Sequence, residues 1–333
     1  MRIFVSGSLA YDRIMNFPGR FVDHILPEKI HILNVCFMVN GLTERFGGTA
    51  GNIAYNLALL GEQPVIVATA GRDFGPYREW LEGLGLPLTG IKEIPGEFTA
   101  GAYITTDLAD NQITGFNPGA MNHTSDYHFD DLDPGTTLAI VAPGGLEDMR
   151  IYSRGYKFRG VQYIFDPGQS IPAWDGDDLK EMAHGALALI VNDYELEMFR
   201  QKTGLDFPGI LKLTPALITT RGEQGSLVQT DRGADTIPAV PVSQVLDPTG
   251  AGDAYRAGLL KGLALGLDWP EAARMGAVLA SFCVEQQGTQ EHRLEVPEFW
   301  GRYTEHFGAP PEAAQPGGSS VPTMAVARVL KEK

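Results

Sequence analysis

Residues 247–258, DPTGAGDAYRAG, carry the most informative pattern in the chain. Pro248 ends an apolar stretch, and Gly250, Ala251 and Gly252 then open a long apolar segment that predicts a helix. Because these three residues have almost no side chain, a ligand can approach their backbone closely and meet free N–H groups. Together with the helix dipole, this turn is suited to hold an anion such as a transferring phosphoryl group.

Asp253 lies in the first turn of the same predicted helix and is directed at the same place. An ionised carboxylate there can orient a hydroxyl nucleophile and accept its proton, and phosphoryl transfer requires mainly such positioning together with charge neutralisation. The alternative is a tight turn that caps a buried helix, with Asp253 as a first-turn charge worth less than about 1 kcal/mol. We favour the anion-binding turn, because a proline, small residues and two flanking aspartates coincide.

The stretch 247–253 closely resembles the C-terminal signature of the ribokinase-like (PfkB-type) carbohydrate and nucleoside kinases. This resemblance implies that Asp253 is the catalytic base and that Gly250, Ala251 and Gly252 form the anion hole. It also implies ATP as the phosphate donor and Mg²⁺ as the metal. The resemblance continues in order from the N-terminus to about residue 290.

Two segments near the N-terminus extend the resemblance. Residues 47–54, GGTAGNIA, open a predicted helix, and by resemblance Gly48 and Asn52 hold the hydroxyls of the phosphate acceptor. Asp12 follows the first predicted strand, where the family places an aspartate that accepts hydrogen bonds from sugar hydroxyls; two carboxylate oxygens suit a vicinal diol. From residue types alone, close helix–sheet packing and an Asx turn remain open as alternatives.

Two later segments resemble the family's nucleotide-binding motifs. Asn192 and Glu195 match an Asn-x-x-Glu motif that organises Mg²⁺-bound water and the ATP phosphates, and Mg²⁺ commonly keeps several waters. A capped helix with an acidic first turn explains the same residues. Thr220, Gly222 and Gly225 resemble the Thr-x-Gly-x-x-Gly nucleotide loop, and the alternative for them is a hairpin turn.

Short apolar runs alternate with longer amphipathic ones, which predicts an α/β fold with a mostly parallel central sheet and helices on both faces. The predicted strands are 3–6, 65–69, 138–142, 163–166, 187–192 and 216–220, and the predicted helices include 50–60, 77–84, 193–203, 252–265 and 270–286. Asp12, Asn192, Thr220 and Asp253 all follow predicted extended runs. Ligands of open parallel sheets bind beyond the carboxyl ends of the strands, so we expect these residues to meet there.

Two stretches, about 10–46 and 98–117, interrupt this alternation. Both contain apolar runs, including 30–39, that predict strands without a helical crossover. We expect them to form a small β lid beside the first strand. An exposed edge of such a lid offers a route to a homodimer.

The chain is predicted to form one kinase domain over residues 1–307, followed by a flexible tail over 308–333. The tail is rich in Pro, Ala, Gly and Ser, with a short helix expected at 324–330. No apolar run approaches the roughly 18 residues that would cross a bilayer.

The composition excludes several classes of partner. The chain has 26 basic and 41 acidic residues, a net charge of −15, which repels nucleic acid and anionic lipid. A helix N-terminus can still bind a phosphate against this overall field. Cys36 and Cys283 have no disulfide or zinc spacing, so we expect two reduced, buried thiols in a cytoplasmic protein.

The acceptor is predicted from three segments that resemble those of prokaryotic nucleoside kinases of this family: 21–27, 110–121 and 166–169. A purine would suit stacking on Phe116 or Phe37, with Met121 filling gaps and Gln169 bonding an edge. We therefore predict an ATP-dependent kinase of the 5′-hydroxyl of adenosine, inosine or guanosine. A sugar kinase of the same family and a non-catalytic nucleoside-binding protein remain open, as does dependence on a monovalent cation.

Overall fold

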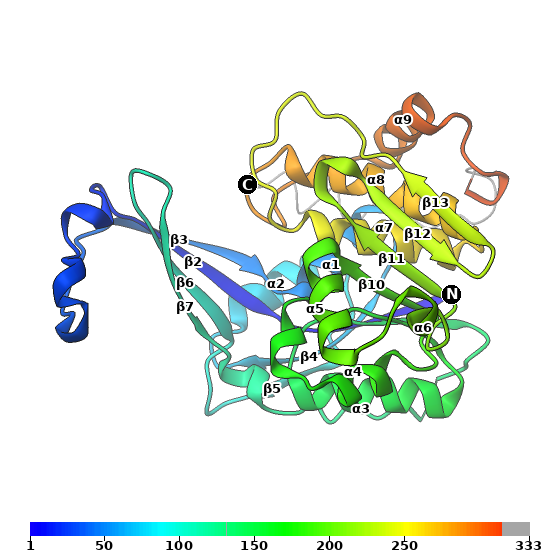
Figure 1. The fold of residues 1–333 in the computed structure, drawn as a ribbon, viewed down its shortest axis with the longest axis horizontal. Helices are drawn as coiled ribbons and strands as arrows, with labels where there is room; N and C mark the ends of the chain where they lie inside the picture. The colour runs from blue at the N-terminus through cyan, green and yellow to red at the C-terminus, as the bar shows by residue number, and fades with distance from the viewer. Residues whose placement is uncertain (131, 315–333) are drawn as a thin grey trace.

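The computed structural model describes residues 1–130 and 132–314. Its centre is a nine-stranded sheet with the strand order β13-β12-β11-β10-β9-β8-β1-β4-β5 (Figure 1). The strands from β11 to β5 are all parallel, and the β12–β13 hairpin continues the sheet antiparallel. The strand bounds are β1 (Arg2–Ser6), β4 (Val65–Gly71), β5 (Ile91–Ile94), β8 (Thr137–Val141), β9 (Gln162–Phe165), β10 (Ala188–Asn192), β11 (Ala216–Thr220), β12 (Ser226–Thr230) and β13 (Gly233–Ile237).

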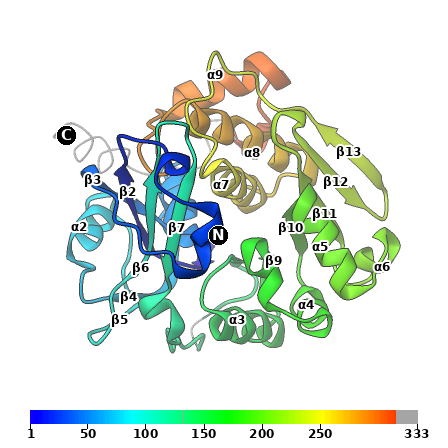
Figure 2. The ribbon, with the colours of Figure 1, turned by 60° about the vertical axis from the view of Figure 1, so that its left-hand side comes forward.

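Helices cover both faces of this sheet, because successive strand residues point to opposite sides. In β1, Ile3 and Val5 belong to one hydrophobic core, whereas Phe4 belongs to the other. The first core includes α1 (Thr49–Leu59), α2 (Gly75–Gly83), α7 (Ala251–Ala264), α8 (Trp269–Val284) and α9 (Val296–Phe307). The second core includes α3 (Leu146–Arg159), α4 (Gly176–Ala183), α5 (Asp193–Thr203) and α6 (Phe207–Leu211) (Figure 2). The predicted α/β architecture is confirmed.

A second, four-stranded sheet projects from this body as an arm (Figure 1). Its order is β3-β2-β6-β7, with β2 and β6 parallel and the outer strands antiparallel. We call this sheet the lid; its strands are β2 (Ala10–Asn16), β3 (Asn40–Gly47), β6 (Ala100–Thr106) and β7 (Gln112–Asn117). The predicted small sheet is therefore present.

The prediction of strands within 30–39 was wrong. A 3-10 helix occupies Pro27–Ile32, with Pro27 at its first position, and the chain up to Val39 is irregular. Phe37 packs against Phe17 and Phe21, with ring centroids 4.8 and 5.0 Å apart, in an aromatic cluster of the lid itself. Phe37 therefore packs within the lid, whereas Ile30, Ile32, Leu33 and Met38 of the same segment are exposed. A contact of Phe37 with a purine stays a prediction.

The apolar stretch before Pro248, residues 242–246, was expected to be extended but belongs to no strand. Leu246 N–H instead donates to the carbonyl of Val284 at 2.8 Å. Cys283 is buried as expected, but Cys36 is exposed because its segment lies along the irregular part of the lid. The expected helix at 324–330 lies outside the described residues. Within the described ranges, no helix is long and apolar enough to cross a membrane.

The connections of the sheet determine where a ligand can enter. From β1 the chain builds β4 and β5 on one side and later returns to build β8 on the other. Ligands of open parallel sheets bind in the crevice where the strand order reverses, beyond the carboxyl ends of the two diverging strands. That point lies between β1 and β8, where Ser6 pairs with Val141. The first turn of α1 closes onto it, since Thr49 Oγ1 donates to the carbonyl of Pro143 at 2.6 Å.

Candidate active site

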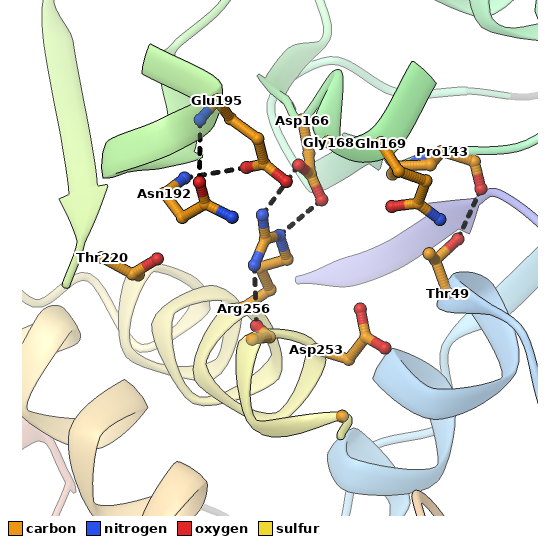
Figure 3. Close-up of a pocket in the computed structure, with 12 residues that line it drawn as sticks. Thr49, Pro143, Asp166, Gly168, Gln169, Asn192, Glu195, Thr220, Asp253 and Arg256 are labelled. Carbon is orange, nitrogen blue, oxygen red and sulfur yellow. Dashed lines mark hydrogen bonds and ion pairs between the residues drawn. The ribbon is translucent and has the colours of Figure 1, made fainter. Parts of the chain in front are cut away.

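A cavity of about 280 Å³ lies at this crevice (Figure 3). Its walls come from segments far apart in sequence: the start of α1, the loops after β8 and β9, the ends of β10 and β11, and the start of α7. The lining residues are Thr49, Pro143, Asp166, Gly168, Gln169, Asn192, Glu195, Thr220, Gly250, Gly252, Asp253 and Arg256. Of the four motif residues expected to meet beyond the strand ends, Asn192, Thr220 and Asp253 line this cavity, whereas Asp12 lies within β2 and is not among the lining residues.

The start of α7 forms a tight turn at the cavity wall. Gly250 has φ +82°, and a Cβ there would approach Thr289 Cγ2 to 2.9 Å, so glycine is required by both conformation and space. Asp247 holds the turn, since its carboxylate accepts the backbone N–H groups of Thr249 and Gly288, each at 2.9 Å. Gly250 and Gly252 line the cavity, whereas Ala251 begins the helix outside the lining.

Asp253 lies in the first turn of α7 and is half-buried at the wall of the cavity. Burial raises the pKa of its carboxyl to about 6, and the Arg256 guanidinium and the Asn52 amide oppose that rise. Asn52 Nδ2 donates to Asp253 Oδ2 at 2.8 Å. A carboxylate with a pKa near 6 is ionised at neutral pH but remains basic enough to accept a proton in a transition state.

Sequence reasoning missed the buried ion pair between Arg256 and Asp166. The Arg256 Nε and Nη2 groups donate to the two oxygens of Asp166, and Nη1 donates to the carbonyl of Gly252 at 3.0 Å. Arg256 and Asp166 are only 7% and 1% exposed. The pKa of Asp166 is raised by burial, an effect that Arg256 counters, and the pKa of Arg256 is raised by its acidic neighbours in spite of burial. A signal existed: Arg256 is three residues after Asp253, on the same face of α7.

One side of the cavity is formed by Asn192, Glu195 and Thr220 (Figure 3). Asn192 ends β10 directly beside Thr220 at the end of β11. Asn192 and Glu195 form a capping box, with both reciprocal hydrogen bonds at 2.8 Å. Burial raises the pKa of Glu195. The capped helix is therefore present and its two capping residues also line the cavity, while their contact with Mg²⁺-bound water and ATP stays a prediction.

Gly222 and Gly225 lie in the turn between β11 and β12 and are absent from the cavity lining as far as the described residues define it. A Cβ at Gly225 would come within 2.0 Å of the carbonyl oxygen of Ile237, so packing in the hairpin requires this glycine. The hairpin interpretation describes this loop, and its contact with a nucleotide stays a prediction.

Some of the residues predicted to hold the acceptor lie at the cavity, and others lie outside its lining. Gln169 lines the cavity opposite Asp253 (Figure 3), and Asn52 contacts Asp253 directly. Gly48 has φ +85° and packs so closely on Ser8 that a Cβ would lie 2.5 Å from its carbonyl oxygen. Asp12 on β2 has its pKa raised by burial. Phe116 is 53% exposed on β7. Contacts of Gly48, Asp12 and Phe116 with a substrate stay predictions.

A glycine-rich helix start, a half-buried carboxylate beside it and a parallel-sheet crevice are the arrangement expected of a phosphotransferase that acts on an alcohol group. Residues 10–296 match the family described as pfkB family carbohydrate kinase. The chain belongs to this family, and its fold is ribokinase-like.

Several relatives are similar to this chain over most of their length. A nucleoside kinase of Methanocaldococcus jannaschii is 32% identical over 269 residues, which span 79% of this chain and 87% of the relative. The structure of the Burkholderia thailandensis nucleoside kinase in complex with inosine has a TM-score of 0.82 and 40% identity, and covers 93% of this chain and 99% of its own. The structure of that enzyme with ADP-inosine has a TM-score of 0.80, 40% identity, and coverage of 97% and 99%.

Proposed function

We propose that the chain is an ATP-dependent nucleoside kinase that phosphorylates the 5′-hydroxyl of a purine nucleoside. The observation that carries this proposal is Asp253: its carboxylate meets the cavity at the start of α7, between the Asn192–Thr220 wall and the Gln169 wall. The nucleoside acceptor is supported by the 40% identical enzyme whose structures contain inosine and ADP-inosine.

Each side chain then has a definite role in the transfer. Asp253 accepts the proton of the 5′-hydroxyl as its oxygen attacks the γ-phosphorus of ATP. The bond from the γ-phosphorus to the bridging oxygen breaks, and ADP and a nucleoside 5′-monophosphate form. The N–H groups at the start of α7, around Gly250 and Gly252, and the guanidinium of Arg256 stabilise the developing negative charge. Gln169 contacts the nucleoside from the opposite wall.

The residues present fit a magnesium ion held through water. Glu195 uses Oε2 in the capping box, which leaves its other oxygen for a water ligand. Among residues 1–130 and 132–314, no cluster of His, Cys, Asp and Glu could hold a metal ion by itself. Oxygen ligands from water and nucleotide phosphates are those that Mg²⁺ prefers, so the ion would neutralise phosphate charge beside Glu195.

Three finer predictions stay with the proposal. Among the described residues, β3 and β7 pair with no further strand at the outer edges of the lid, and nearby apolar residues such as Met38 and Leu42 are 84% and 60% exposed. Both observations support pairing of two copies through the lid. A cytoplasmic location and a monovalent-cation requirement stay predictions without further support.

The test is ADP release from MgATP with a panel of adenosine, inosine, guanosine, cytidine, ribose and fructose, for the wild type and Asp253→Asn. We expect turnover with purine nucleosides and a fall in kcat of about 10²- to 10⁴-fold in the variant, because the base is lost. Asp177→Asn is the matched control, since Asp177 also lies in the first turn of a helix but its side chain is 93% exposed.

The panel also separates the alternatives. Turnover with a free sugar alone would keep the chemistry and replace the nucleoside by a carbohydrate. Nucleoside binding by calorimetry without ADP release would identify a non-catalytic binding protein. Full activity of Asp253→Asn would remove Asp253 from the role of base.

A further inference from the structure

A buried chain of side-chain hydrogen bonds reaches Asp253 from outside the cavity. Trp80 Nε1 donates to Gln290 Oε1 at 2.9 Å, and Gln290 Nε2 donates to Asn52 Oδ1 at 3.0 Å. Asn52 Nδ2 in turn donates to Asp253 Oδ2 at 2.8 Å. Gln290 and Asn52 are only 3% and 5% exposed. Gln290 does not line the cavity, and none of the motifs in the sequence includes it.

The orientation of the amides in this series of hydrogen bonds is determined by which groups can donate and which can accept. The indole N–H of Trp80 is a donor and nothing else, so the amide oxygen of Gln290 must face it. The amide nitrogen of Gln290 then faces Asn52, which must present its oxygen. The nitrogen of Asn52 is left to face the Asp253 carboxylate. An amide turned the other way would place an oxygen against that carboxylate.

Tyr77 holds Gln290 through a second hydrogen bond. Its hydroxyl donates to the carbonyl of Gly47 at 2.8 Å and therefore accepts from Gln290 Nε2 at 2.7 Å. A Cβ on Gly51 would lie 1.8 Å from this hydroxyl, so the glycine in the first turn of α1 keeps space for it. Gln290 is thus held from two sides, and both sides demand the same orientation of its amide.

We propose that Gln290 is a positioning residue for phosphoryl transfer, which fixes the Asn52 amide so that its nitrogen faces Asp253. Gln290 touches neither substrate and acts through Asn52. This inference rests on the proposed role of Asp253 as base. In this inference Gly51 and Asn52, in the second glycine-rich segment, serve to orient an amide toward Asp253 in addition to the hydroxyl binding predicted for Asn52.

Other charged and titratable groups lie around Asp253, and three of them, Arg256, Asp166 and Glu195, act on its pKa together with Asn52. They are Arg256 on the same helix, Asp166 after β9, Glu195 on α5, Tyr77 on α2 and Cys283 on α8. Of these groups, Tyr77 accepts a hydrogen bond from Gln290 Nε2. A substitution of Gln290 therefore reaches Asp253 mainly through the Asn52 amide.

The decisive variant is Gln290→Glu, which keeps the length of the side chain and removes its donors. The new carboxylate accepts from Trp80 and forces Asn52 to turn its nitrogen toward residue 290 and its oxygen toward Asp253. We expect the acidic limb of the kcat/KM profile against pH to move up by about one unit, so that kcat/KM falls about tenfold at pH 5 but only about twofold at pH 7. Tyr55→Phe is the matched control: Tyr55 is fully buried on α1 but donates to the carbonyl of His292. Its pH profile should equal that of the wild type.

A double-variant cycle shows whether Asn52 transmits the effect. In an Asn52→Ala background, Gln290→Glu should produce no additional movement of the acidic limb. An unchanged limb in the single variant, or an equal extra shift without Asn52, would overturn the inference. If Gln290→Glu does not fold, Trp80→Phe removes the orienting indole N–H and should move the limb in the same direction by less.

The outcome remains separate from that of the proposed function. If Asp253→Asn retains full turnover, the assignment of the base fails. If Asp253→Asn is inactive while Gln290→Glu keeps the wild-type profile, only the positioning role fails.

Discussion

The nine-stranded sheet of the body and the four-stranded sheet of the lid differ in the burial of their side chains. Every residue of β8 in the body is buried, whereas every residue of β7 in the lid is exposed. Helices cover both faces of the body sheet, and its two cores fix the strand ends that carry Asn192 and Thr220. Apolar lid residues such as Ile113 and Phe116 contribute little to folding in this conformation and remain available to a ligand or a partner.

This difference separates stability from specificity. Substitutions at the buried polar groups of the body should lower both the free energy of unfolding and the rate of phosphoryl transfer. Substitutions on the lid should change the KM for the acceptor and leave unfolding unchanged. Three predictions test this division, in order of expected size.

The largest effect is expected from Arg256→Met, which leaves the buried Asp166 carboxylate without its partner. Breaking a buried ion pair in this way costs about 3–5 kcal/mol of unfolding free energy. Urea unfolding measures this loss, and kcat should fall as well because Arg256 lines the cavity.

Two companion variants sharpen this prediction. Arg154→Met is the matched control: Arg154 pairs with Glu181 through two hydrogen bonds of 2.7 and 2.9 Å, but the side chains are 56% and 44% exposed. It should cost under about 1 kcal/mol. The double variant Asp166→Leu/Arg256→Met should recover stability without activity. Recovery of activity would show that the pair is structural only.

The second prediction concerns His292, which is fully buried between α1 and the chain after α8 and bonds Asn56 Oδ1 at 2.8 Å. Burial lowers the pKa of His292 to about 4 from 6.5. Its unfolded form therefore binds a proton more tightly, so its contribution to stability is present above pH 6.5 and is lost as the pH falls toward 4. Between pH 7 and pH 5 this loss is about 2 kcal/mol.

Comparison of the wild type with His292→Gln isolates this contribution. Urea unfolding at pH 7 and pH 5 should show a drop in the wild type that is about 2 kcal/mol larger than in the variant. The exposed His31 provides the control, since His31→Gln should leave the pH dependence as it is. Equal pH dependence in wild type and His292→Gln would mean that the site accommodates the protonated ring.

The sequence predicted those parts of the site whose signal is local. Short segments were enough to predict the turn around Gly250, the position of Asp253 beside it and the strand ends at Asn192 and Thr220, because helix starts and apolar strands leave local patterns. The six predicted body strands are all present. The division into residues 1–307 and a tail stays a prediction, since part of the tail lies outside the described residues.

Long-range pairings could not be predicted in this way. Asp166 and Arg256 are 90 positions apart, and Asn52 and Gln290 are 238 apart, so only the folded chain brings them together. The strands predicted in the lid segment 30–39 are absent for a related reason. This apolar segment has the composition of a strand, but it begins in a 3-10 helix and continues as irregular chain, with Phe37 in an aromatic cluster and Ile30 and Met38 exposed.

The smallest expected effect lies on the lid, and it tests whether β7 reads the nucleoside. Side chains alternate along a strand, so Phe116 and Ile113 point to opposite faces of the lid, and they are similarly exposed, at 53% and 46%. Loss of one aromatic stacking partner costs about 1 kcal/mol, so Phe116→Ala should raise the KM for a purine nucleoside about fivefold at unchanged kcat. Ile113→Ala should leave KM unchanged, and neither variant should alter urea unfolding. An effect of Ile113→Ala in place of Phe116→Ala would assign the acceptor to the other face of the lid, and a loss of stability in both would remove the distinction between lid and body.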